Sequence, residues 1–143
     1  MSDKPRHVKL TIEERNKVVK TLTERHRAHL ASGETFLYDG HVSHGEVELR
    51  VELANADDTD VLTLEGRVDL VENDIQDPAE GKHLLMDFLD EVLIEYFEDD
   101  RDLRPDLDWK SYDYQSREVW VRGERRNRKL DRLADELLNS GGA

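Results

Sequence analysis

The 143-residue chain contains no cysteine, and this absence excludes disulfide bonds and metal sites built from thiolates. A reducing compartment is therefore the simplest assumption for it. The sequence also lacks any apolar run approaching the ~18 residues that a membrane-spanning helix needs. Its start, MSDKPRHVKL, does not have the apolar stretch of a secretory signal. We expect a cytoplasmic protein with no membrane partner.

Motifs for catalysis and cofactor binding are missing as well. The sequence has no glycine-rich phosphate loop, no G-x-S-x-G nucleophile motif and no H-E-x-x-H zinc motif. Among 34 acidic residues some carboxylate pairs arise by chance, and no spacing marks one pair as acid and base. His26 and His29 share a predicted helix face, where histidines are ordinarily surface residues. We predict no catalytic residue, no cofactor and no metal site, with a small enzyme kept as an alternative.

Negative charge dominates what the sequence does contain. The formal net charge is -13, with 38% charged and 36% hydrophobic residues. Leucine, isoleucine, valine and phenylalanine make up 37 of the 143 residues, above the level of about 20% below which highly charged chains stay disordered. We expect one folded domain at residues 11–138, with a flexible arm at 1–10 and a flexible tail at 139–143. The charge disfavours nucleic acid as a partner, because phosphates would be repelled.

Three segments have the pattern of amphipathic helices. Thr11 and Glu14 form a capping box, which starts a helix running to about residue 31. The second helix begins at Asp77-Pro78, an N-cap followed by proline at the first helical position, and continues with a broad apolar stripe. The third is the last element, with Asn127 as its cap. Its apolar face consists of Leu130, Leu133, Ala134, Leu137 and Leu138.

Strands are predicted between the helices. Asp39-Gly40 separates two short apolar runs and suits the positive φ angles of a type I′ turn, so we expect a hairpin there. Residues 47–53 and 62–70 alternate between apolar and polar, as strands with one buried and one wet face do. A second hairpin is expected at residues 108–123, with its turn centred on Ser116 and Arg117.

These patterns together predict a two-layer α+β domain. An antiparallel sheet of four or five strands would carry three helices, in the order α-β-β-(β)-α-β-β-α. The apolar faces of the helices would pack against the apolar face of the sheet, which leaves the charged strand face outside the core.

Positive charge is gathered near the C-terminus of this acidic chain. From Arg117 to Arg132 the sequence places 7 of its 21 basic residues. Four of them crowd the start of the predicted last helix, where the helix dipole favours anions by roughly 0.3–1 kcal/mol per charge. Some other interaction should offset this cost. Either carboxylates of the same chain pair with the cluster, or an anionic or acidic partner binds it.

Trp120 lies within the second predicted hairpin, and strand geometry decides which way its indole points. If Val119 and Val121 enter the core, Trp120 and Arg122 lie together on the other face, because successive side chains point oppositely. Tryptophan and arginine are both enriched at interface hot spots. The alternative is that another part of the chain covers Trp120. We interpret Trp109, at the start of the hairpin, as core or hinge packing.

We therefore predict a non-catalytic binding or adaptor domain that recognises an acidic protein segment or a small anion. Trp120 would anchor the partner in a desolvated contact, and the basic side chains would orient it. Self-association is left open. The predicted binding residues are Trp120, Arg122, Arg125, Arg126, Arg128 and Lys129.

A second hypothesis comes from the order of elements, the size and the acidity, which together look like the small chaperones of type III secretion systems. The resemblance spans most of residues 11–138 and lies in the succession of elements, without a specific sequence motif. It implies an acidic α+β homodimer that holds a partly unfolded partner polypeptide along exposed apolar patches. It assigns no role to any single residue.

Overall fold

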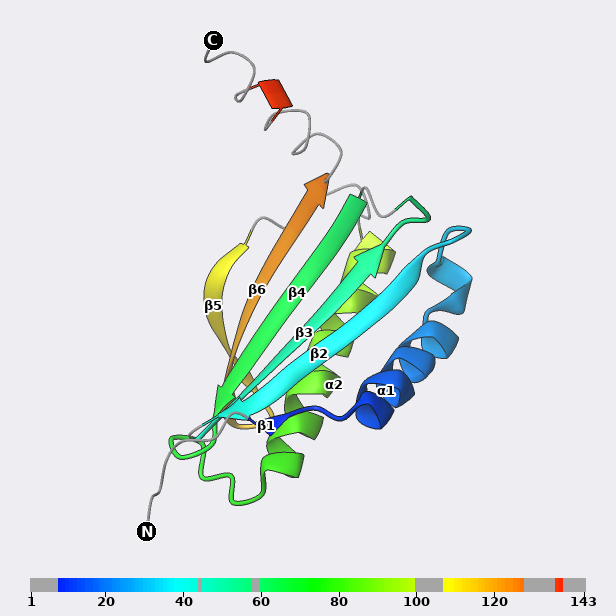
Figure 1. Ribbon diagram of the computed structural model, residues 1–143. Coiled ribbons are helices and arrows are strands. Elements are labelled where there is room, and N and C mark those ends of the chain that lie inside the picture. The colour runs from blue at the N-terminus through cyan, green and yellow to red at the C-terminus, as the bar shows by residue number, and fades with distance from the viewer. Residues whose placement is uncertain (1–7, 44, 58–59, 100–106, 128–135, 138–143) are drawn as a thin grey trace.

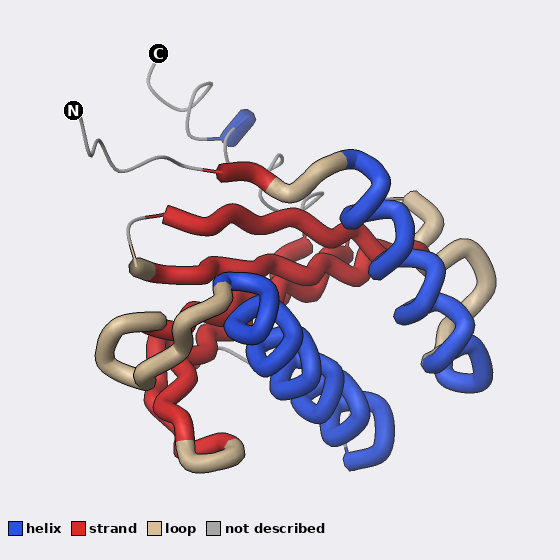
Figure 2. Tube along the Cα trace, turned by 90° about the horizontal axis from the view of Figure 1, so that it is seen from below, coloured by secondary structure: helices blue, strands red, loops and turns tan. Residues whose placement is uncertain are grey.

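The computed structural model describes residues 8–43, 45–57, 60–99, 107–127 and 136–137. They form one antiparallel sheet with both α-helices on the same face, and the sheet curves around the second helix (Figures 1 and 2). The elements are β1 (Val8–Lys9), α1 (Ile12–Arg25), η1 (Arg27–His29), β2 (Thr35–Ser43), β3 (Glu46–Ala54), β4 (Asp60–Asp69), α2 (Pro78–Asp99), β5 (Leu107–Tyr114) and β6 (Arg117–Asn127).

The sheet has six strands in the order β1-β2-β3-β4-β6-β5, and every neighbouring pair is antiparallel. The predicted α+β class is confirmed, whereas the predicted number of four or five strands is too low. β6 pairs with β4, so the chain returns after α2 to complete the sheet, and β5 becomes an edge strand. Alternate residues of β3 and β4 enter the core, as their period-two patterns predict.

The extra strand comes from the segment expected to be a loose arm. Val8 and Lys9 form β1 and pair with Val42 and His41 of β2. Leu10 is 5% exposed and belongs to the core, and its N–H donates to the Gly40 carbonyl at 3.1 Å. The prediction of a flexible arm is therefore wrong for residues 8–10, while residues 1–7 and the tail at 139–143 lie outside the described residues.

The first helix begins as predicted and ends early. The Thr11 hydroxyl accepts from the Glu14 N–H at 3.1 Å, and Glu14 reaches back to the Thr11 N–H, which completes the capping box. The helix ends at Arg25 instead of near residue 31, and the short turn η1 follows. His26, at this junction, is 2% exposed, so a buried polar contact accompanies the change of direction.

Asp39-Gly40 is not a turn. Both residues lie inside the nine-residue strand β2, and the connection to β3 falls at residues 44–45, where Gly45 has φ 73°. A side chain at Gly40 would place its Cβ 2.6 Å from the Glu48 carbonyl oxygen. The glycine therefore permits a close approach of β2 to β3, which the sequence pattern does not distinguish from a turn.

The second helix matches its prediction. Asp77 Oδ1 accepts from the Ala79 N–H at 3.0 Å, and Pro78 is the first helical residue. Leu85, Leu89 and Leu93 are each 0% exposed and face the sheet. A helix packed this closely requires a small residue beneath it, and a Cβ on Gly66 of β4 would lie 2.8 Å from Leu85 Cδ1.

The second hairpin turns one position earlier than predicted. Its turn residues are Gln115 and Ser116, with φ 52° and 63°, as in a type I′ turn. Tyr112 therefore pairs with Val119 rather than with Val121. Because this register differs from the predicted one by two residues, every side chain stays on the face that was expected.

The residues at which the predicted last helix would begin after its cap, 128–135, lie outside the described part of the chain. β6 continues to Asn127, so Arg125 and Arg126 lie in a strand. The expected cap, Asn127, is the last residue of that strand. Of the residues predicted to form the helix, only 136–137 are described, and both are helical.

Candidate recognition surface on the open sheet face

We call the sheet face opposite α1 and α2 the open face, because no described helix covers it (Figures 1 and 2). Trp120 lies on this face, as strand alternation predicts. Val119 and Val121 are 0% and 2% exposed in the core, whereas Trp120 is partly exposed and pairs with Arg67 of β4. The indole N–H donates to Glu118 Oε1 at 3.1 Å, which fixes the edge of the ring.

Arg67 lies against two tryptophans of the open face. Its guanidinium carbon is 4.5 Å from the ring centroid of Trp109 and 5.5 Å from that of Trp120. Cation–π contacts contribute about 0.5–1 kcal/mol each at exposed sites. The core position interpreted for Trp109 is wrong, since its ring packs on Arg67 and is partly exposed. Alternation alone places Arg67 on the charged face, but only the strand register brings it to the two rings.

The predicted basic site is divided by the fold. Arg122 lies on the open face beside Trp120 and forms an ion pair with Glu124 at 3.2 Å. Arg125 pairs with Leu62 in the strand register, so it lies on the helix-covered face. Its guanidinium binds both oxygens of Asp60, at 3.0 and 2.7 Å. The expectation that these arginines form one surface is therefore wrong for Arg125.

The side chains of the other three predicted binding residues lie outside the described part of the chain. Arg126 pairs with Val61 through its backbone in β6, where it follows the parity of Trp120, and its side chain is outside the described part of the chain. Arg128 and Lys129 lie outside the described residues altogether. The predicted concentration of cations at a helix start is thus not what brings Trp120 and Arg122 together; strand alternation does so.

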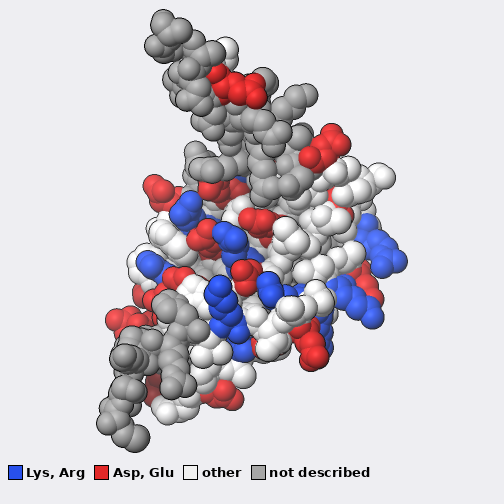
Figure 3. Space-filling view, viewed as in Figure 1, with Lys and Arg blue, Asp and Glu red and all other residues white. Residues whose placement is uncertain are grey.

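The open face is acidic despite these arginines. Basic and acidic side chains are interspersed across it (Figure 3). Among the described side chains that strand register assigns to this face, carboxylates outnumber cations by nine to four. The carboxylates are Asp39, Glu46, Glu48, Glu52, Glu65, Asp69, Asp113, Glu118 and Glu124, and the cations are Lys9, Arg50, Arg67 and Arg122.

A shallow hollow of about 190 Å³ lies in the same face beside Trp109. The pair formed by His41 Nε2 and Glu48 Oε2, at 3.2 Å, contributes to its lining. Nearby, burial and then a hydrogen bond with Glu48 raise the pKa of Glu46. Packing two carboxyl groups on one strand in this way costs less when one of them is protonated or when a cation approaches.

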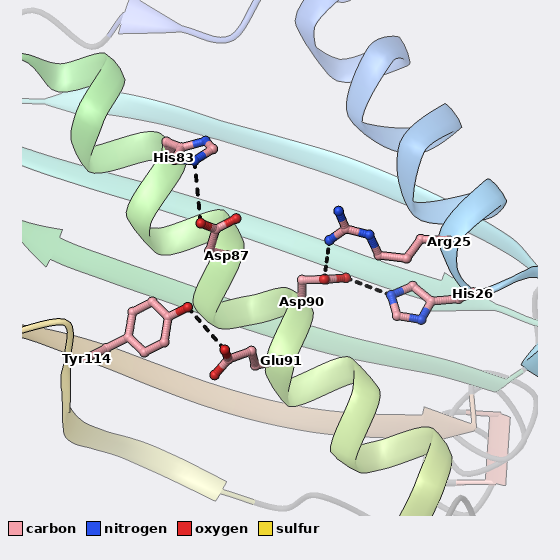
Figure 4. A network of polar contacts seen from close by, with 7 residues as sticks. All are labelled: Arg25, His26, His83, Asp87, Asp90, Glu91 and Tyr114. Atoms are coloured by element: carbon pink, nitrogen blue, oxygen red, sulfur yellow. Dashed lines mark hydrogen bonds and ion pairs between the residues drawn. The ribbon is translucent and has the colours of Figure 1, made fainter.

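The helix-covered layer contains a buried polar contact that sequence reasoning missed. Asp90 of α2 is 6% exposed, and its two oxygens bind Arg25 and, at 2.7 Å, His26 Nε2 (Figure 4). The His26 ring also packs 5.3 Å from Phe97. His26 is thus a buried residue that ties α1 to α2, and the surface position expected for it is wrong. A histidine inside an expected helix carries no sequence signal for this role.

Comparisons with protein-family models, curated proteins and solved structures find no match for this chain. In the described part of the chain, no helix is long and apolar enough to cross a membrane. Within the same residues, no three histidine, aspartate or glutamate side chains are grouped so that they could hold a metal ion.

Proposed function

We propose that this chain is a non-catalytic binding domain that recognises a protein partner through the open face of its sheet. The observation that carries the proposal is the Trp109–Arg67–Trp120 stack, which presents two partly exposed indoles on a face that no described helix covers. Tryptophan and arginine are enriched at interface hot spots, and tryptophan buries much contact area at a low cost in conformational entropy. Together with Arg122, this stack is the centre of the proposed contact.

The charge of the open face changes the expected chemistry of the partner. Arg122 is already paired with Glu124, and among the described side chains of this face carboxylates outnumber cations by nine to four. An acidic segment or a small anion would therefore meet net repulsion. A partner with lysine or arginine side chains would instead relieve the repulsion among these carboxylates, including that between Glu46 and Glu48. We therefore propose that the partner presents a basic surface.

Binding of labelled decalysine and decaglutamate, followed by fluorescence anisotropy, tests this proposal. We expect decalysine to bind and Trp120→Ala to weaken it about tenfold or more, as loss of a hot-spot residue does. Tyr112→Ala is the matched control, because Tyr112 lies on the same hairpin but contacts Phe88 on the other face. If decalysine were attracted only by the net negative charge of the protein, Trp120→Ala would leave its affinity unchanged, and this result would contradict the proposal. Equal binding of decalysine and decaglutamate would contradict it as well.

A chaperone-like homodimer is the second candidate. The observation that favours it is that the chain from α1 onward runs through a helix, three strands, a helix and two strands. The order of elements, together with size and acidity, is what resembles the type III secretion chaperones. Light scattering at micromolar concentration distinguishes the candidates, because this one requires twice the mass of a single chain. A monomer at all accessible concentrations would remove it and would leave the binding-domain proposal intact.

A further inference from the structure

A groove of about 380 Å³ lies between α1 and α2, on the layer opposite the open face. Its volume falls within the range of roughly 300–1,000 Å³ that is typical of small-molecule sites. Val18 and Leu22 of α1 and Met86 of α2 provide apolar walls. The groove shares no residue with the Trp109–Arg67–Trp120 stack, so inferences about it do not depend on the function proposed above.

Tyr38 reaches this groove from β2, in the layer beneath the two helices. It is 7% exposed, yet within the described part of the chain its hydroxyl forms no hydrogen bond. Burial, followed by the charges of Glu14 and Asp39, raises the pKa of Tyr38, so the hydroxyl keeps its proton and can donate. Among the described residues only Arg15 Nε is a fully enclosed polar atom without a partner, so the Tyr38 hydroxyl opens onto the groove, where it can donate to an acceptor of a ligand.

In the described part of the chain, the charges around the groove are matched except for Lys17 on α1 and for Asp87 on α2, whose contact with His83 is an ion pair only when that histidine is protonated. Lys82 binds Glu14 at 3.0 Å, and Arg25 and His26 of α1 reach across to Asp90 (Figure 4). Asp87 contacts His83 at 3.5 Å on the α2 side. Lys17, which also lines the groove, has no ion-pair partner among the described residues. The uncompensated charge nearest the apolar wall of α1 is therefore positive.

We propose that this groove binds a small amphipathic carboxylate. Its apolar chain would lie against Val18, Leu22 and Met86, and its carboxylate would accept a hydrogen bond from Tyr38 and face Lys17. The carboxylate supplies the acceptor that the Tyr38 hydroxyl lacks, and the chain removes apolar groove surface from water. Binding on the α1 side also keeps the negative head away from Asp87.

Isothermal titration calorimetry with decanoate tests the proposal. We expect one site per chain and a three- to tenfold weaker affinity for Tyr38→Phe, roughly the net contribution of one hydrogen bond. Without ligand, Tyr38→Phe should have about the stability of the wild type, because the hydroxyl that it removes forms no hydrogen bond within the described part of the chain. Lys17→Gln should weaken binding about two- to fivefold, whereas Lys20→Gln, an exposed residue on the same helix, should not.

Two further measurements distinguish recognition of the ligand's charge from general binding of an apolar chain. Decyltrimethylammonium, which has a matched chain and a positive head, should bind at least tenfold more weakly than decanoate. Asp87→Asn should strengthen decanoate binding, because it removes a like charge from the rim. Absence of decanoate binding, equal affinity for the two probes, or an unchanged affinity in Tyr38→Phe would each overturn the proposal.

Discussion

Glu46 and Glu48 stand two residues apart on β3, so the pleat of the strand places both carboxyl groups on the open face. Glu46 also pairs with Asp69 across the sheet. Burial and the hydrogen bond with Glu48 raise the pKa of Glu46, and the charge of Arg67 opposes this shift without cancelling it. The ionised form of Glu46 therefore lowers the stability of the folded state, as is common where a surface serves a partner rather than the fold.

This arrangement predicts a pH-dependent gain for Glu46→Gln. The pKa of Glu46 in the folded state lies above the unfolded value of about 4.3, so ionisation of Glu46 costs no stability below that value. The loss of stability grows as pH rises from there through the folded pKa. The free energy of unfolding of Glu46→Gln should exceed that of the wild type at about pH 7 and equal it at about pH 3.5, measured by urea denaturation. Glu24→Gln, on the exposed side of α1, is the control for the loss of one charge. An equal gain in both variants would contradict the assignment.

Asp90 of α2 makes one of the polar contacts between the two helices, besides the ion pair of Glu14 and Lys82. α1 packs against β2 and α2 against β3 and β4, so the helices lie over different parts of the sheet. Asp90 accepts from Arg25 and contacts His26 at the end of α1, which ties the two elements together beside the groove (Figure 4). The contact lies where α1 ends, at Arg25 and its C-cap His26.

Asp90→Ala should therefore destabilise the fold. We expect the free energy of unfolding to fall by about 2–3 kcal/mol, because a buried, charge-assisted contact is lost while His26 stays enclosed. Asp87→Ala, one turn earlier on α2 and more exposed, should change it by less than about 0.5 kcal/mol. Chemical denaturation of both variants measures the difference. Comparable losses would mean that Asp90 serves only as a surface charge.

At the scale of the whole molecule, net negative charge and a two-layer architecture define the available surfaces. The chain carries 34 acidic and 21 basic residues. One layer presents an acidic, tryptophan-containing sheet face, and the other contains the groove between the helices. Self-repulsion among the carboxylates opposes compaction, and the ion pairs that Arg125 and Arg25 form offset only part of it.

Salt should consequently stabilise this protein. Raising NaCl from about 20 mM to about 500 mM shortens the screening length to a few ångströms, which weakens repulsion between exposed carboxylates more than it weakens the partly buried pairs. We expect the urea midpoint to rise with salt. A midpoint that falls would show that attractive pairs outweigh the net charge.

Local features of the fold follow from the sequence because neighbouring residues supply them. The Thr11–Glu14 box, the Asp77-Pro78 helix start and the alternation of β3 and β4 each depend on backbone geometry within a few positions. The same alternation placed Trp120 opposite the core. For this reason the α+β class and the position of the indole could both be predicted.

Contacts between distant segments decided the rest. Gly40 lies in a strand because Glu48 and Leu49 approach it, Leu10 enters the core because β2 accepts another strand, and Arg125 extends β6 because Asp60 binds it. Each local preference that was overturned, for a turn or an arm, is worth about 1 kcal/mol, and one well-formed tertiary contact is worth as much. Only the folded chain could therefore bring Arg67 to the two tryptophans and place Tyr38 beneath the groove between the two helices.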